Sequence, residues 1–277
     1  MRTTQIELLI RGGDEKLQVQ RKAWATGVLD LMEANLPSSA LLVVLDDVDC
    51  DYFRSDDGLR MGKDNRGFFM PMTPCNANDL LSVPYISDGI LDVSYEMIEA
   101  GRCYAFDGLI YLYDSTCRDR AGFTMTFAHE LQHFVQWGSN RALWAANSLA
   151  QSVLRRMEPH DYAQLQVKIN HRFRHHDFAH EYDARLVAKR ICVGVVGGAS
   201  TSAYIRARKD AATCEIDIAD WEFVSELDET GGYDMTKGTR ALYARLRSIT
   251  PTLQKFIGDC KKHAIADYQD VSVEEWL

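Results

Sequence analysis

Two histidines and a glutamate form the pattern H-E-x-x-H in the stretch FAHELQH, residues 127–133. The stretch lies inside a segment from Arg118 to Trp137 for which the apolar spacing predicts a helix. At about 100° per residue, His129 and His133 lie about 40° apart on the helix surface, so both imidazoles can bind one ion. Zinc suits this geometry, and Glu130 stands beside the two ligands.

A catalytic zinc ion takes three protein ligands and keeps one position for water, so the two histidines need a third partner. The extended motif H-E-x-x-H-x-x-G-x-x-H does not supply it, because Gln136 and Ser139 stand where its glycine and last histidine would be. We expect the third ligand to be Glu181, on a later helical segment. The small residue Ala184 follows three positions on and would let the two helices approach closely.

Other side chains near Glu181 compete for this role. Four histidines surround it in the sequence, and each is an alternative third ligand: His171, His175, His176 and His180. Asp177, one turn before Glu181, could instead accept a hydrogen bond from a ligating imidazole and fix its tautomer. The residues leave these alternatives open, with Glu181 preferred.

The motif also predicts a hydrolytic mechanism. Bound zinc lowers the pKa of its water from about 15.7 toward roughly 7, which provides a nucleophile at neutral pH. We expect Glu130 to act as the general base on this water and to pass the proton to the leaving amine. The oxyanion needs a further donor, and the candidates near the third ligand are Tyr182, His180 and His176.

The histidine motif and the later glutamate together resemble the gluzincin metallopeptidases. More narrowly, GLIYL at residues 108–112, followed by RAGFTMTFAHELQH at residues 120–133, is similar to the edge strand and active-site helix of ImmA/IrrE-type peptidases. The likeness covers the chain from Cys103 to about Cys192. Two residues depart from the family pattern, because Gln132 replaces a glycine often found in the motif and Arg185 stands where many gluzincins carry an aspartate.

This resemblance implies an α+β, zincin-like fold that is mostly helical, with a small mixed β-sheet packed on the active-site helix. It also implies that the strand from Leu109 to Tyr113 is the edge strand with which a substrate peptide pairs. The implied activity is zinc-dependent hydrolysis of peptide bonds in a specific intracellular protein, such as a transcriptional regulator. The resemblance does not extend to the N-terminal and C-terminal parts of the chain.

The rest of the sequence predicts the elements that must position this site. Helical spacing predicts helices at 15–35, 91–100, 118–137, 142–157, 177–195 and 239–263, the last with a break at Pro251. Apolar runs predict strands at 41–45, 67–70, 109–113 and 214–218. Asp107-Gly108 predicts the tight turn of a hairpin, and residues 51–66 are polar enough for a loop.

Nothing in the sequence forces a domain boundary, because repeats, low-complexity tracts and Pro-rich linkers are absent. We therefore expect one zincin-like domain over residues 1–277. Residues 1–100 should supply the backing helix and the first strands. Residues 101–196 should form the metal-binding core, and residues 197–277 a C-terminal helical part.

The composition limits the partners of the protein. With 46% hydrophobic and 26% charged residues, the chain is typical of a globular protein. Its 31 Lys and Arg residues against 40 Asp and Glu give a formal charge of -9, which disfavours direct binding to nucleic acid. Seven scattered cysteines favour free thiols in a reducing compartment. Without a signal peptide or a long apolar run, we expect a cytoplasmic protein outside the membrane.

Two other function classes fit parts of the sequence. A zinc-binding sensor or interaction protein would share the histidine motif but close the fourth coordination position with a protein ligand such as His176. A phosphotransferase would use Asp47-Val48-Asp49 after the strand at 41–45, but no later paired-aspartate motif accompanies it. The sequence does not indicate the oligomeric state.

Overall fold

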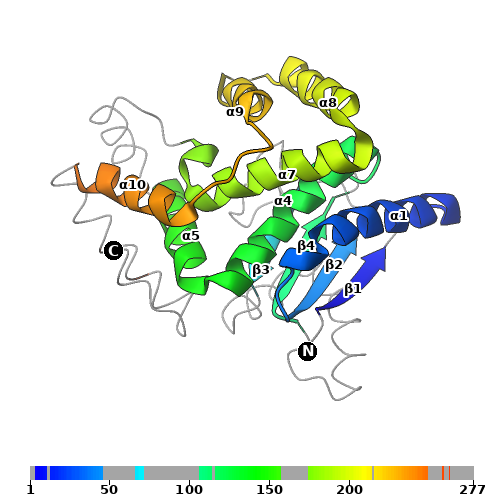
Figure 1. Ribbon diagram of the computed structural model, residues 1–277, viewed down its shortest axis with the longest axis horizontal. Coiled ribbons are helices and arrows are strands. Elements are labelled where there is room, and N and C mark those ends of the chain that lie inside the picture. Colours follow the sequence, from blue (N-terminus) through cyan, green and yellow to red (C-terminus); the bar gives the residue numbers. More distant parts are fainter. Residues whose placement is uncertain are drawn as a thin grey trace.

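The computed structural model describes residues 4–10, 13–45, 66–71, 106–113, 116–156, 174–213 and 215–248, with residues 258 and 262. These residues form an α+β structure that is mostly helical (Figure 1). Its strands are β1 (Gln5–Ile10), β2 (Ala40–Leu45), β3 (Gly67–Pro71) and β4 (Gly108–Leu112). Its helices are α1 (Glu15–Met32), α4 (Arg120–Ser139), α5 (Arg141–Arg156), α7 (Ala179–Val196), α8 (Gly198–Ala211), α9 (Glu215–Glu226) and α10 (Met235–Arg247), with the short 3-10 helices η1 (Glu33–Asn35) and η3 (His175–Asp177).

The four strands form one mixed sheet in the order β1-β2-β4-β3. β1, β2 and β4 are parallel, whereas β3 runs antiparallel to β4. β2 and β4 are apolar and buried almost throughout, as is typical of central strands covered on both faces. The expectation that residues 109–113 form the edge strand is therefore wrong, because β4 is paired on both sides. Among the described strands, β3 is the outer strand on that side of the sheet.

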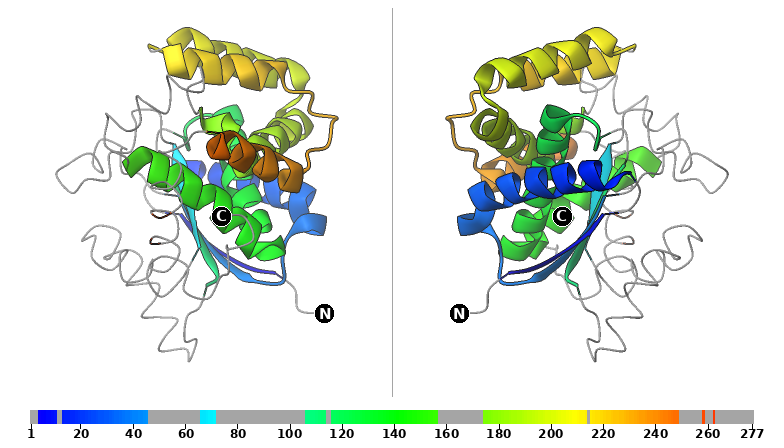
Figure 2. Two further views of the ribbon diagram at one scale, coloured as in Figure 1. Left: turned by 90° about the vertical axis from the view of Figure 1, so that its left-hand side faces the viewer. Right: turned by 90° about the vertical axis from the view of Figure 1, so that its right-hand side faces the viewer.

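The helices that pack on the sheet, α1 and α4, lie on one of its faces (Figure 2). α4 and α7 run side by side there, and α1 packs against the same face. The main hydrophobic core fills the space between them, with buried residues such as Val28 from α1, Val43 from β2, Phe127 from α4 and Cys192 from α7. Ile205 and Val224 extend this core into α8 and α9.

Most predicted elements are confirmed within a few residues. The predicted helices at 15–35, 118–137, 142–157 and 177–195 correspond to α1 with η1, α4, α5 and α7. The predicted strands at 41–45, 67–70 and 109–113 correspond to β2, β3 and β4. The helix predicted at 91–100, most of the loop at 51–66, and the Asp47-Val48-Asp49 motif lie outside the described residues.

Three local expectations need correction. The strand predicted at 214–218 is wrong, because α9 begins at Glu215 and packs its Trp221 ring edge-on against Tyr204 of α8, at 5.9 Å between centroids. The tight turn at Asp107-Gly108 is not formed either. Gly108 begins β4, and the Asp107 carboxylate accepts a hydrogen bond from the Ala40 N–H at 2.8 Å, which ties β4 to the start of β2. Strand β1 was not predicted.

Two further observations concern the helices and the cysteines. In the part of the chain that the structure describes, every helix is too short or too polar to cross a membrane. Of the seven cysteines, the described ones are Cys117 and Cys192, which are both buried. Cys192 is a free thiol, as the scattered cysteine pattern predicts for this position.

Candidate metal centre

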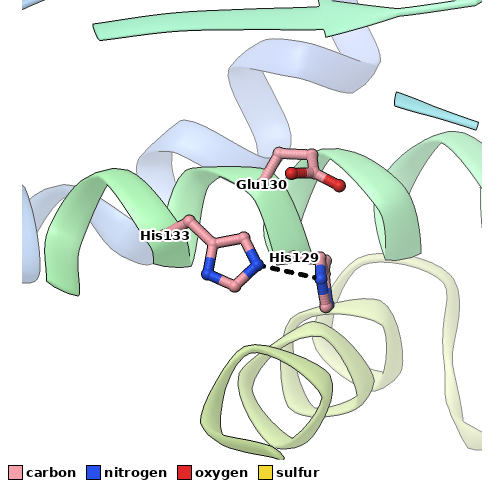
Figure 3. Close-up of side chains that lie close together, drawn as sticks. All are labelled: His129, Glu130 and His133. Atoms are coloured by element: carbon pink, nitrogen blue, oxygen red, sulfur yellow. Dashed lines mark hydrogen bonds between the residues drawn. The ribbon is translucent and has the colours of Figure 1, made fainter. Parts of the chain in front are cut away.

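Helix α4 presents the motif between the sheet and α7. The Asp119 carboxylate caps the helix by accepting a hydrogen bond from the Gly122 N–H at 2.7 Å. Two turns further on, the imidazoles of His129 and His133 lie on the side that faces α7, and Glu130 projects toward the sheet (Figure 3). Of these three side chains, Glu130 and His133 are buried, and His129 is partly exposed.

Three ligand atoms from α4 and α7 converge. The Nε2 atoms of His129 and His133 lie 3.1 Å apart, and Oε2 of Glu181 lies 3.2 Å from the first and 3.5 Å from the second. In a tetrahedral site with metal–ligand distances of about 2.0–2.1 Å, neighbouring ligand atoms are about 3.3–3.4 Å apart. The spacing of the three atoms therefore fits a zinc ion.

The Glu181 carboxylate gives a second indication that a cation fits here. Its Oε2 atom is buried and accepts no hydrogen bond of good geometry. Three imidazole nitrogens nevertheless lie within 3.5 Å of this atom, namely Nε2 of His129, Nε2 of His133 and Nδ1 of His175. A buried acceptor without a hydrogen bond costs about 1–3 kcal/mol, and more when it is charged. A cation between the carboxylate and the imidazoles would remove this cost.

Glu130 is also close to the two motif histidines, since one ligand atom from each of the three residues lies within 4.8 Å of the others. The carboxylates of Glu130 and Glu181 differ in the hydrogen bonds that they accept. The Phe69 N–H of β3 donates a hydrogen bond to Glu130, whereas Oε2 of Glu181 has no such partner and lies within 3.5 Å of both Nε2 atoms. Of the two carboxylates, Glu181 is therefore the better placed to complete a metal site with the two histidines.

Glu130 has the electrostatic surroundings of a proton acceptor. Burial raises the pKa of the Glu130 carboxyl above its ordinary value, against the lowering effect of the two neighbouring histidines and of the Phe69 N–H. A carboxylate with a raised pKa takes up a proton near neutral pH more readily than an exposed one.

In the protein without metal, a buried ion pair forms at this point. Burial disfavours the charged form of His133, but the Glu181 carboxylate beside it raises the pKa of His133 to about 9. Burial alone would raise the pKa of Glu181, but His175 and His133 hold it well below its usual range. At neutral pH Glu181 is therefore a negatively charged carboxylate, and His133 is a positively charged imidazolium with a hydrogen on both ring nitrogens.

Two of the three candidate oxyanion donors, His180 and Tyr182, lie in different surroundings. His180 is buried behind the ligands, with Nε2 3.6 Å from Oε1 of Glu181, and burial lowers its pKa well below the ordinary value. The Tyr182 ring stacks on Tyr233 at 4.1 Å and meets Phe223 at 5.2 Å between centroids. In the described residues, no hydrogen bond or ring contact joins Tyr182 to a motif histidine, so Tyr182 serves to pack α7 against the C-terminal segment.

Among the competing histidines that the structure describes, His175 joins His180 close to Glu181, with Nδ1 3.0 Å from Oε2. His176 is engaged elsewhere, because its Nδ1 lies 3.0 Å from Oδ1 of Asp220 and its ring stacks on Phe223 at 4.0 Å. His171 lies outside the described residues. The fourth protein donor that would close the site is therefore His175 instead of His176.

The predicted role of Asp177 is wrong. Its carboxylate accepts hydrogen bonds from the Arg174 N–H at 2.6 Å and from Nη1 of Arg245 at 2.9 Å. Asp177 therefore stabilises the turn η3 and links it to α10, and neither of these hydrogen bonds involves a ligating imidazole. The side chain that does hydrogen-bond a motif histidine is Gln136, whose Oε1 lies 2.9 Å from Nδ1 of His133.

Sequence reasoning missed two further neighbours of the ligands. Gln136 lies three residues after His133, so helical spacing alone could have identified it. Gln151 of α5 donates a hydrogen bond from Nε2 to Oε1 of Glu181 at 3.1 Å. No sequence signal points to this contact, because it depends on how α5 packs beside α7.

Comparisons with known proteins return no relative of this chain. It matches no protein-family model, and no curated protein or solved structure is significantly similar to it. The resemblance to gluzincins therefore depends on the motif residues themselves.

Proposed function

We propose that the protein is a zinc-dependent metallopeptidase of the gluzincin type that cleaves a specific protein substrate. The observation that supports this function best is the spacing of the ligand atoms of His129, His133 and Glu181, at 3.1, 3.2 and 3.5 Å from one another. These three residues would hold the zinc ion. When bound, zinc supplies Lewis-acid chemistry, by which water is activated and the scissile carbonyl is polarised.

Glu130 would move the proton in this reaction. It would take a proton from the attacking water and deliver it to the leaving amine, so that one carboxylate serves both steps. The Phe69 N–H holds this carboxylate on the sheet side of α4, apart from the ligand carboxylate of Glu181. Its raised pKa suits a group that must gain and lose a proton near neutral pH.

An extended substrate would pair with β3 instead of β4. The Arg66 carbonyl accepts a hydrogen bond from the Tyr113 N–H at 3.1 Å, which sets the alternation along this antiparallel pair. The backbone of Phe69, an odd number of residues further on, consequently faces away from β4, as its hydrogen bond to Glu130 also requires. A peptide on this side could pair with the Phe69 carbonyl oxygen, because the Phe69 N–H already donates to Glu130, and it would lie next to the general base.

A zinc-binding sensor or interaction protein is the second candidate function. His175 supports it, because its Nδ1 atom is 3.0 Å from the ligand oxygen of Glu181. If His175 were a fourth ligand, the zinc site would be closed and would stabilise or sense without catalysing. The two functions therefore differ in whether an exogenous ligand can reach the metal.

The first experiment tests whether the site is open without requiring knowledge of the substrate. The full-length protein is loaded with Co²⁺ in place of zinc, and its visible absorption spectrum is followed during titration with acetohydroxamic acid. In an open peptidase site the hydroxamate should bind the Co²⁺ ion, and the visible absorption spectrum of the cobalt protein should change. A protein that takes up no metal, or a cobalt spectrum that the hydroxamate leaves unchanged, would contradict the peptidase function, and the second outcome would support the closed site.

The second experiment tests cleavage with a fluorescence-quenched peptide library derived from a proteome digest. Glu130→Gln should lower the cleavage rate about 10²–10⁴-fold, because the amide cannot accept the proton. The variant should keep its zinc, which metal analysis of the same sample would check. Equal rates for the variant and the original protein, or an open zinc site with no cleavage of any library peptide, would contradict the assignment.

A further inference from the structure

A buried amide connects the metal site to α7. Gln136 is 5% exposed, and its Oε1 atom lies 2.9 Å from Nδ1 of His133. Its Nε2 atom lies 2.9 Å from the His180 carbonyl oxygen and 2.9 Å from Oδ2 of Asp183. Every polar atom of this side chain therefore has a partner.

The chemistry of these partners fixes the orientation of the amide. A backbone carbonyl and a carboxylate only accept hydrogen bonds, so the NH₂ group of Gln136 must face His180 and Asp183. The amide oxygen must then face His133. Because that oxygen also only accepts, Nδ1 of His133 has to carry the hydrogen atom and donate it. The remaining nitrogen, Nε2, is the one that lies beside His129 and Glu181.

Asp183 also accepts a hydrogen bond from a second amide on the same face of α4. Nε2 of Gln132 donates a hydrogen bond to Oδ2 of Asp183 at 2.7 Å, so one carboxylate oxygen orients both glutamines. This arrangement accounts for two departures from the gluzincin pattern. Gln132 replaces the frequent glycine, and Asp183, two residues after Glu181, provides an acidic group where the usual later position holds Arg185.

We propose that Gln136 and Asp183 are positioning residues that hold His133 in the tautomer and orientation required for binding metal through Nε2. This inference rests on the proposed zinc site and adds the residues that prepare it. Asp183 orients the Gln136 amide, and Gln136 orients the imidazole. Partners of this kind typically change metal affinity about 10–100-fold when they are removed.

The test measures zinc affinity by competition with a chromophoric chelator, using the full-length protein. Gln136→Leu should weaken zinc binding about 10–100-fold. Gln132→Leu is the matched control, because it removes an amide of the same size from the same helix but leaves the hydrogen bond to His133 in place. We expect its loss of affinity to be clearly smaller.

A charge exchange distinguishes positioning from a merely structural role. Gln136→Glu places two carboxylates next to each other and should weaken zinc binding strongly. Adding Asp183→Asn restores one carboxylate and one amide, and the carboxylate introduced at position 136 can still accept from His133, so the double variant should recover affinity relative to Gln136→Glu. In the zinc-loaded protein, a long-range ¹H–¹⁵N spectrum should show the Nδ1 hydrogen of His133 protected from exchange, and Gln136→Leu should remove that protection.

The outcomes separate this inference from the proposed function. If the original protein, Gln136→Leu and Gln136→Glu all bind zinc equally well, the positioning role of Gln136 and Asp183 is overturned and the zinc site stands. Affinity changes without any change in the His133 spectrum, or a double variant no better than Gln136→Glu, would also overturn it. If the original protein does not bind zinc, both the metal site and the positioning role of Gln136 and Asp183 are overturned.

Discussion

The two motif histidines occupy contrasting surroundings although they lie one turn apart on the same helix. The His133 side chain is 7% exposed, and its Nδ1 is held by Gln136 and, through it, by Asp183. The His129 side chain is 16% exposed, and none of the described residues hydrogen-bonds its Nδ1. The site therefore has a fixed half, where hydrogen bonds hold His133, and an adjustable half, formed by His129 and the neighbouring His175, where we expect the side chains to move when a ligand binds.

The largest expected difference concerns folding in the absence of metal. His133→Ala removes the group that donates to the buried Oε1 of Gln136, and a buried acceptor left without a partner costs about 1–3 kcal/mol. His129→Ala leaves the hydrogen bond between His133 and Gln136 in place, so it does not carry this cost. Chemical denaturation in the presence of a chelator should therefore show a free energy of unfolding lower by about 1–3 kcal/mol for His133→Ala than for His129→Ala. Equal losses would break the contrast between the two halves.

A smaller difference is expected in how zinc affinity depends on pH. The pKa of His133 is raised to about 9 in the metal-free protein, so a proton must leave Nε2 whenever a metal binds below that pH. The apparent affinity should accordingly rise about tenfold per pH unit from pH 7 and level off above about pH 9. Glu181, whose pKa is held well below its usual range, is already ionised throughout this window.

Two variants test which histidine causes this dependence of zinc affinity on pH. His129→Ala should bind zinc more weakly but keep the slope, because His133 still pairs with Glu181. His133→Ala should flatten it. Chelator competition between about pH 6.5 and 9 measures both, and a slope that survives the loss of His133 would show that the proton leaves another group. The pH range follows from the raised pKa of His133.

The part of the site that sequence alone could predict is the part set by helical geometry. The motif histidines share one helix, so their spacing follows from the helix period, and the apolar runs and caps that define α4 and α7 are equally local. Glu181 could be chosen because the small residue Ala184, which is fully buried, permits close packing of α7. These predictions use no information about how distant elements pack.

Strand order and side-chain partners depend on packing that the pattern does not contain. β2, β3 and β4 are all short apolar runs, so nothing in their composition shows that β3 folds back outside β4. The alternating Ile216 and Ile218 suggested a strand, whereas packing against α8 selects a helix there. For the same reason the sequence offers Asp177 as one candidate partner of a ligating imidazole, whereas in the structure Gln136 contacts His133 and Asp183 contacts Gln136.

The smallest expected effect is that of His175, on the adjustable side of the site. Its side chain is 30% exposed, and its Nδ1 lies 3.0 Å from Oε2 of Glu181 and 3.2 Å from Nη2 of Arg185. A hydrogen on Nδ1 would donate to Glu181, and a lone pair on Nδ1 would accept from Arg185, so this nitrogen is engaged in either state and is not available to a metal. We therefore expect His175→Ala to change zinc affinity less than about threefold, since no ligand is lost.

His176→Ala is the control for this measurement, because it loosens the same turn η3 through Asp220 without touching Glu181. Cobalt spectra and chelator competition would be compared for the two variants and the original protein. A tenfold or greater loss of affinity in His175→Ala alone, with a changed cobalt spectrum, would make His175 a fourth ligand. The adjustable half would then be closed by the protein itself, and the sensor function would replace the peptidase.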